Sequence, residues 1–284
     1  MSTRSPLRNR KRTAMTLACF ASIAPVLTSC AQRDGSAIEQ RSMSRGRLLF
    51  EDRFDGNHLD GERWNTCHWW GPDGCTISTN NELQWYVPQQ VDVRAGTLRL
   101  SASRHRTVGN DGRTYAYRSG MVTTGRTADS TPAAKFAYRY GYLEVRARIP
   151  RGAGLWPALW LLPATNESLP EIDLAEVRGS RPDTISMHLH WRDPSGRAKQ
   201  RGARTTLRST AEGWHVFALD WQRDSLRWLV DGVERWRVQG PEVPSEPMYV
   251  IANLAIGGDW AGPPNAETPF PATFEIDRVT VWAS

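Results

Sequence analysis

Strict alternation of apolar and polar residues over short runs is the feature that most limits how this sequence can fold. The run YGYLEVRARIP (residues 140–150) alternates in this way, and so do DVRAGTLRLSASR (92–104) and TFEIDRVTVW (273–282). Successive side chains of a β-strand point to opposite faces of a sheet, so the pattern predicts strands with one buried face. Two further alternating runs meet at Asp231-Gly232, a pair typical of a hairpin turn.

Helical periodicity is missing from the rest of the sequence. No stretch repeats its apolar residues with a helical period over the ~10 residues that a helix needs. Short strands separated by turns every ~8 to 12 residues indicate an all-β sandwich or barrel. We see no internal repeat, and we expect one domain over residues 47–284.

The first 29 residues have the pattern of an export signal. Five basic residues between Arg4 and Arg12 precede the apolar run AMTLACFASIAPVL and then LTSC, which resembles the lipobox of bacterial lipoproteins. We therefore expect a signal peptide over 1–29, lipid on Cys30, and a flexible tether over 30–46. The mature protein would be held at the bacterial cell envelope; cleavage by an ordinary signal peptidase, giving a secreted protein, is the alternative.

The net charge of +6 comes mostly from this leader. Removing its five basic residues from the 36 in the chain leaves 31 basic against 30 acidic residues. The mature protein is then almost neutral, so its charge does not indicate a nucleic-acid partner. No apolar run reaches the ~18 residues that a membrane-spanning helix needs, so the lipid would be the membrane contact.

Cys67 and Cys75 are the two cysteines that remain after the leader and the lipidated Cys30. They flank HWWGPDG, a segment with proline and glycine residues to turn the chain. A disulfide is expected between cysteines so placed in an exported protein. A metal site is the alternative, but it would lack two further thiols.

Three acids lie within six residues in EIDLAE: Glu171, Asp173 and Glu176. In a regular strand, the first two share a face and the third points to the other. One extra residue, a β-bulge at Leu174 and Ala175, would bring Glu176 to the same side, and bulges recur beside active sites.

Glycoside hydrolysis is the chemistry that uses two such carboxylates. A retaining enzyme needs a nucleophile and an acid/base ~5 Å apart, and repulsion between them helps keep the acid protonated. A solvent-facing acidic strand and a Ca²⁺ site are the alternatives. Trp156 and Trp160 in the preceding GLWPALWLLP share one face of a strand, where they could stack on sugar rings or pack in the core. The 13 tryptophans of the chain favour a glycan-binding surface for some of them.

From Phe50 to Trp282 the sequence resembles glycoside hydrolase family 16, especially its laminarinase-like endo-β-1,3-glucanases. The blocks that carry the resemblance follow in the family's order: FEDRFDGNHLDGERWN, NNELQWYVPQQVDVRAGTLRLSA, YRSGMVTT, YGYLEVRARIPRGAGLWPALWLLP, EIDLAE and IANLAIGGDWAGPPNAETPFPATFEIDRVTVW. The resemblance implies a β-jelly roll sandwich of two curved antiparallel sheets, with a glycan cleft on the concave face.

Roles for the three acids follow from the same resemblance. Glu171 resembles the nucleophile, Asp173 the carboxylate that assists it, and Glu176 the acid/base. Further positions resemble substrate contacts: Asn81, Glu82, Arg146, Trp156, Trp160, His190, Trp191 and Trp260. Surface charge is the alternative for Arg146, and a buried histidine is the alternative for His190.

The chain also departs from the family's pattern. The connection before Glu171 is the short ATNESLP, which leaves the substrate preference open. Many relatives bind one structural Ca²⁺ through an aspartate that resembles Asp277, but Arg53 stands where they often have glutamate. We expect no metal to be needed for the reaction itself.

These features together predict a monomeric, retaining endo-glycosidase that hydrolyses β-1,3-glucan or mixed β-1,3/1,4-glucan. A hydrolase or transglycosylase for exopolysaccharide is an alternative within the family. A glycan-binding protein without activity is the alternative of another class.

Overall fold

The computed structural model describes residues 46–68, 74–126, 134–165, 167–207 and 213–284, all of them within the compact unit Ser44–Ser284. The predicted leader, the lipidation site Cys30 and the tether up to residue 45 lie outside the described residues. No helix in the described part of the chain is long and apolar enough to cross a membrane.

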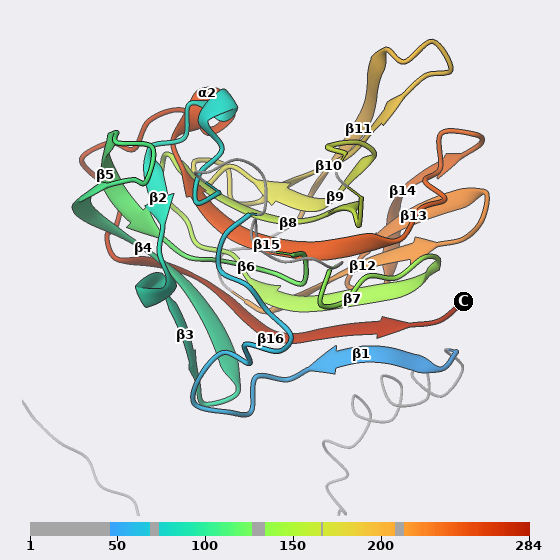
Figure 1. Cartoon of the computed structure of the whole chain (residues 1–284), viewed down its shortest axis with the longest axis horizontal. Coiled ribbons are helices and arrows are strands. Elements are labelled where there is room, and N and C mark those ends of the chain that lie inside the picture. Colours follow the sequence, from blue (N-terminus) through green and yellow to red (C-terminus); the bar gives the residue numbers. More distant parts are fainter. Residues whose placement is uncertain (1–45, 69–73, 127–133, 166, 208–212) are drawn as a thin grey trace, which may run out of the picture. The chain divides into compact units, whose positions relative to one another are not determined.

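Strands make up most of the described chain, and they form two sheets that Figure 1 shows as curved layers. The larger sheet has ten strands: β1 (Leu48–Asp52), β2 (Gln84–Tyr86), β3 (Val91–Arg94), β4 (Thr97–Val108), β5 (Thr114–Ser119), β7 (Gly141–Arg148), β12 (His215–Trp221), β13 (Ser225–Val230), β14 (Val233–Gln239) and β16 (Ala272–Trp282). The other has six: β6 (Met121–Thr123), β8 (Leu155–Pro163), β9 (Glu171–Val177), β10 (Thr184–Arg192), β11 (Ala198–Thr206) and β15 (Met248–Ile256).

The strand order explains how distant parts of the sequence meet. It is β14-β13-β12-β7-β16-β4-β5-β2 in the larger sheet, with β1 beside β16 and β3 beside β4. The smaller sheet follows the order β11-β10-β9-β8-β15-β6, which places β9 near its middle. Every pair is antiparallel except β2 with β5. The short helices are η1 (Ser78–Asn80), η2 (Pro88–Gln90) and α2 (Gly258–Ala261).

The main core lies between the two sheets. It takes alternate residues of the strands, such as Leu143 and Val145 from β7 and Ile172 and Val177 from β9. A second, smaller cluster covers the opposite face of the six-stranded sheet and includes Trp160. Strand β15 is buried on both faces, which explains its apolar run, interrupted only by Asn253. These features confirm the predicted all-β sandwich of two curved sheets.

The predicted disulfide is also confirmed. Cys67 and Cys75 are bonded, with their Cα atoms 4.8 Å apart.

Candidate active site

The three acids lie on β9, on the face of the six-stranded sheet that is turned away from the main core. The pairing of β8 with β9 shifts between Leu159, opposite Ala175, and Trp160, opposite Asp173. Leu174 is therefore the extra residue, which confirms the predicted bulge and brings Glu176 to the face of Asp173.

An indole from the other sheet supports this bulge. A bulge interrupts the ladder of backbone hydrogen bonds, and a buried group left without a partner costs free energy. Trp228, fully buried on β13, donates its Nε1–H to the backbone oxygen of Asp173 at 2.9 Å. The core thus fixes the backbone from which the acids project.

The acids line a cleft of about 480 Å³. Residues from three strands of the six-stranded sheet (β8, β9 and β15) and from two connections surround it: Ile77, Thr79, Asn80, Glu82, Trp156, Ala158, Trp160, Leu162, Glu167, Ser168, Glu171, Asp173, Glu176 and Asn253. The three predicted acids therefore lie in a concave, partly aromatic cleft, as expected for sugar binding.

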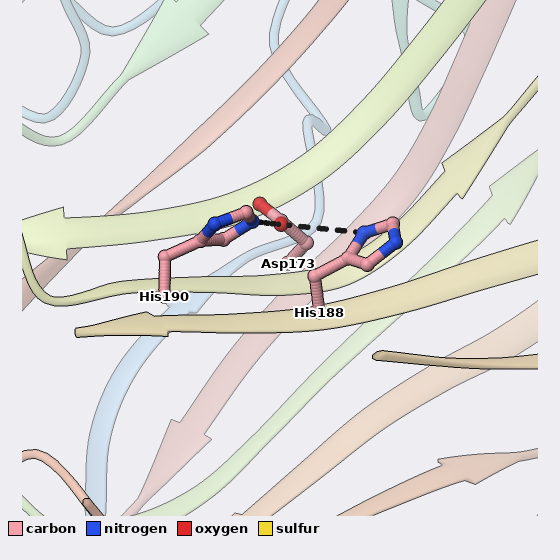
Figure 2. Close-up of side chains that lie close together, drawn as sticks. All are labelled: Asp173, His188 and His190. Atoms are coloured by element: carbon pink, nitrogen blue, oxygen red, sulfur yellow. Dashed lines mark hydrogen bonds and ion pairs between the residues drawn. The ribbon is translucent and has the colours of Figure 1, made fainter. Parts of the chain in front are cut away.

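Asp173 lies between two histidines of the neighbouring strand β10, as Figure 2 shows. His190 Nε2 is 3.2 Å from Asp173 Oδ2, and His188 Nδ1 is 3.6 Å from the same oxygen. Burial alone would raise the pKa of Asp173, but the hydrogen bonds and charges of the two histidines outweigh it and lower this pKa. Asp173 is therefore the acid that stays ionised.

The same three side chains could also hold a metal ion, since their ligand atoms lie within 4.8 Å of one another. Their mutual hydrogen bonds already give each of them a partner. In this arrangement the two histidines hold the carboxylates of Asp173 and Glu176 in place.

Glu176 accepts hydrogen bonds through both of its oxygens. Trp156 Nε1 donates to Oε1 at 3.0 Å, and His188 Nδ1 lies 2.7 Å from Oε2. Burial and the charge of Asp173 raise the pKa of Glu176, and the two donors partly offset the rise. Burial lowers the pKa of His188, but its two carboxylate partners outweigh this and raise the pKa to about 9. His188 is therefore a cation at neutral pH and donates to Glu176.

Glu171 lies at the start of β9, with Asp173 as its nearest charged neighbour. Burial, followed by the charges of Asp173 and Glu176, raises the pKa of Glu171 well above its usual value. Burial and mutual repulsion thus favour a shared proton in this cluster of three carboxyls, as an acid/base pair requires.

Aromatic rings form the floor and one wall of the cleft. Trp156 lies against Trp260 of α2, with ring centroids 5.0 Å apart. Trp160 is held by its Nε1–H, which donates to Asn253 Oδ1 at 2.7 Å. The structure thus places three of the four predicted tryptophans around the acids, with Trp260 joined through Trp156.

The segment before β2 contributes a buried acid. Glu82 accepts from Asn80 at 3.0 Å and from Gln84 at 2.6 Å, and burial raises its pKa to about 7. Asn81 has a left-handed backbone, with φ 55°, and its amide donates to Asp259 at the cleft rim. The structure thus brings Glu82 into the cleft and leaves Asn81 at its edge.

Two predicted substrate contacts lie elsewhere. Arg146 points outward from the ten-stranded sheet, where it pairs with Asp277 and lies over Trp214 at 4.9 Å. This face is on the other side of the sandwich from the acids. Trp191 packs against the main core, because it follows His190 directly and so points to the opposite face of β10. Neither residue lines the cleft, and both predictions are corrected.

Asp277 was predicted as a calcium ligand. Its Oδ2 is engaged by Arg146, while Oδ1 has no hydrogen-bond partner in the described part of the chain. A cation would have one oxygen available, next to a guanidinium that repels it. Calcium binding therefore stays a prediction.

Two residues of the site were given no role by the sequence analysis. His188 is the partner of Glu176, and its alternation with His190 in MHLHW was the available signal. Asn253 bridges Trp160 and the Tyr86 hydroxyl; a lone amide inside the apolar run of β15 marked it.

Comparison with known proteins agrees with this geometry. The profile of "Glycosyl hydrolases family 16" matches residues 79–277. The chain belongs to this family. The match includes β9 with its three acids, and it confirms the resemblance recognised in the sequence.

Similar proteins carry names from the same family. Endo-1,3-1,4-beta-glycanase EglC of Rhizobium meliloti is 32% identical over 253 residues, which cover 82% of this chain and 51% of that protein. Beta-glucanase of Rhodothermus marinus is 31% identical, covering 83% of this chain and 84% of that protein. The laminarinase catalytic domain of Thermotoga maritima superposes with a TM-score of 0.74 at 29% identity, covering 85% and 99% of the two chains. The family 16 chain described here spans about half the length of EglC.

Proposed function

We propose that the protein is a retaining endo-glycosidase that hydrolyses β-1,3-glucan or mixed β-1,3/1,4-glucan. The observation that carries the proposal is the bulged strand β9, which turns Glu171, Asp173 and Glu176 into one cleft. The printed names of the relatives, an endo-1,3-1,4-beta-glycanase and a laminarinase among them, support β-glucan as the substrate.

In the first step, Glu171 as carboxylate attacks the anomeric carbon and forms a glycosyl ester. Glu176 gives its proton to the glycosidic oxygen, and the leaving sugar departs with that proton. The resulting Glu176 carboxylate is stabilised by the N–H groups of Trp156 and His188, which already point at its two oxygens.

In the second step, Glu176 takes a proton from water, and the hydroxide formed attacks the same carbon. The ester breaks, Glu171 is released as carboxylate, and the configuration is retained. Asp173, held ionised by the two histidines, keeps negative charge beside Glu171 and orients it. The cycle needs one proton shared by the two glutamates, which burial and repulsion provide.

A sugar acceptor could replace water in the second step, so transglycosylation of an exopolysaccharide uses the same residues. A binding protein without activity would need none of the three acids, since aromatic platforms alone bind glycans. Keeping three like charges in one buried site costs stability, and hydrolysis or transfer explains that cost where binding does not.

The test is product release from a panel of glycans: laminarin, lichenan, curdlan, cellulose, agarose and xylan. The fragment 31–284 and its Glu171→Gln variant would be compared by chromatography. We expect oligosaccharides from laminarin or lichenan with the native fragment and none with the variant. Equal release by both would refute the assignment of Glu171, and binding without release would favour the glycan-binding alternative.

We also propose that Cys30 anchors the enzyme to the cell envelope. The export signal and the lipobox-like LTSC support this, together with a disulfide of the kind found outside the cytoplasm. Mass spectrometry of the mature N-terminus, with and without globomycin, tests it. An unmodified N-terminus at another residue would refute the anchor.

A further inference from the structure

A small hollow of about 40 Å³ adjoins the cleft at the end where Glu176 lies. It is lined by Arg178, Arg181, Thr184, Ser186, Arg204 and Trp260. Three arginines around one hollow are unexpected in a protein whose predicted mature form is almost neutral.

The register of the strands places this hollow on the same face as the acids. Ser186 of β10 is the partner of Glu176 of β9, and Arg204 of β11 is the partner of Ser186. Directly paired residues of neighbouring strands point to the same side of a sheet. Figure 1 shows the turn of the β10–β11 hairpin extending beyond the neighbouring strands; Arg204 lies in the part of β11 away from this turn, opposite Ser186.

Aromatic rings connect the hollow to the acid/base. Trp156 donates to Glu176 at 3.0 Å and lies against Trp260, whose centroid is 5.0 Å away. The guanidinium of Arg178 lies over the Trp260 ring at 4.4 Å. A sugar ring on this pair of indoles would therefore lie between the acid/base and the arginines.

Among the described residues, the hollow has an excess of positive charge. Within the described residues, none of its three arginines forms an ion pair with a carboxylate. The acid in the connecting segment, Asp183, accepts from the Thr184 hydroxyl at 3.2 Å instead. The other basic side chains on β11 are paired: Lys199 with Asp193 at 3.6 Å, and Arg201 with Glu242.

We propose, on the basis of the function proposed above, that this hollow binds an anionic substituent of the glycan, a carboxylate or a sulfate. Arginine guanidiniums match such groups in a planar, bidentate geometry, and the hydroxyl of Ser186 adds a donor. The enzyme then acts on acidic β-glucan-like polysaccharide in preference to neutral chains.

The hollow takes the sugar on the leaving-group side of the cleaved bond. Glu176 must contact the glycosidic oxygen, while Glu171 attacks the retained sugar from the other face. Ser186 of the hollow is paired with Glu176, whereas Glu171 is paired with His190, which does not line the hollow. The anionic group therefore belongs to the product that leaves first.

The test compares kcat/KM on carboxymethyl-curdlan and on curdlan sulfate with kcat/KM on neutral laminarin. The double variant Arg181→Gln/Arg204→Gln should lower the anionic-to-neutral ratio about tenfold, because two charge-assisted hydrogen bonds are lost. Arg94→Gln, an exposed arginine on β3 paired with Asp92, is the matched control and should keep the native ratio. Added NaCl should weaken the native preference by screening it.

The polymer whose kcat/KM ratio to laminarin falls in the double variant identifies the group that the hollow binds. A fall with carboxymethyl-curdlan indicates a carboxylate, and a fall with curdlan sulfate indicates a sulfate. An unchanged ratio in the double variant on both polymers would overturn the inference while leaving the proposed hydrolysis intact. Affinity electrophoresis of Glu171→Gln, with and without the two arginine changes, gives the same comparison by binding alone. This binding measurement tests the inference even if no polymer is hydrolysed. Absence of hydrolysis would count against the proposed function alone.

Discussion

Both outer faces of this sandwich carry acids that are almost fully buried, yet the two faces surround them differently. On the ten-stranded sheet, Glu275 is 5% exposed and pairs with Arg99 and Arg148. Asp220 on the same face pairs with Arg227. Each buried negative charge there has a positive partner on a neighbouring strand.

On the six-stranded sheet, Asp173 is 3% exposed and its nearest charged neighbours along β9 are two more acids. Histidines and indoles surround the group instead of arginines. An acid paired with an arginine keeps a fixed charge, whereas an acid beside other acids exchanges protons readily. Burial is similar on both faces, so the partners decide which acids stabilise the fold and which do chemistry.

The largest effect that follows from this difference concerns Glu176. Replacing it with glutamine removes the proton donor and should lower kcat on laminarin by about 10²- to 10⁴-fold. The variant should still fold, because Asp173 remains as a carboxylate partner of His188 and the amide oxygen can still accept one hydrogen bond. Initial rates and thermal unfolding of the variant, side by side with native enzyme, measure both quantities.

A substrate with a good leaving group supplies the control for Glu176→Gln. An activated aryl glycoside needs no proton for its departure, so the variant should keep most of its glycosylation rate on it. Equal losses on aryl glycoside and laminarin would contradict the assignment of Glu176 as the acid.

The opposite outcome is expected for Glu275→Gln on the ten-stranded sheet. It leaves two arginines without their carboxylate, so the free energy of unfolding should fall by about 1–3 kcal/mol. Because Glu275 lies on the far side of the sandwich, kcat/KM per folded molecule should stay at the native value. Chemical denaturation gives the first quantity; a clear drop in kcat/KM of folded enzyme would show that the two faces are coupled.

The sequence predicted the local part of this picture. Alternation and spacing depend on neighbours along the chain, so the strands and the bulge that gathers Glu171 and Glu176 were predictable. Which outer face a strand residue joins depends on sheet order, and so Arg146 was assigned to the wrong side. Trp191 was a different error, since its position next to His190 already excludes a shared face.

Contacts across long separations were beyond the sequence. The Trp228 indole reaches the bulge from another sheet, 55 residues away along the chain, and Asn81 meets Asp259 across 178 residues. No spacing rule predicts either contact.

A moderate effect is expected from His188→Leu, with His215→Leu as its counterpart on the ten-stranded sheet, where His215 pairs with Asp231 at 2.7 Å. The His188 cation stabilises ionised Glu176, so its loss should raise the pKa of Glu176 further. Activity needs Glu176 protonated and falls as pH rises through this pKa. The alkaline limb of kcat should therefore move to higher pH in His188→Leu and stay in place in His215→Leu.

The pH dependence of the free energy of unfolding gives a second test of the His188 pairing. The pKa of His188 is raised to about 9 in the folded protein from an ordinary value of ~6.5. Its contribution to folding is complete below that ordinary value and is lost as pH rises through about 9. Urea unfolding should be measured below pH ~6.5 and above pH about 9. The free energy of unfolding should fall between these two pH values in native enzyme, and fall less in His188→Leu. An equal fall in both proteins would show that His188 gains no stability from the carboxylates.

The smallest effect concerns calcium at Asp277. With Oδ2 held by Arg146, the carboxylate offers a cation one oxygen, and we expect binding no tighter than about 1 mM, the weak end for extracellular sites. At 1 mM Ca²⁺ this adds only about 0.4 kcal/mol to stability. Arg146→Gln should enlarge the calcium-dependent shift in unfolding temperature, because it frees the second oxygen and removes the repelling charge. If calcium stabilised the native protein by several kcal/mol, Arg146 would not be what limits calcium binding at Asp277. A larger shift in the variant alone would show that the arginine partner is what keeps an acid on this face from binding another cation.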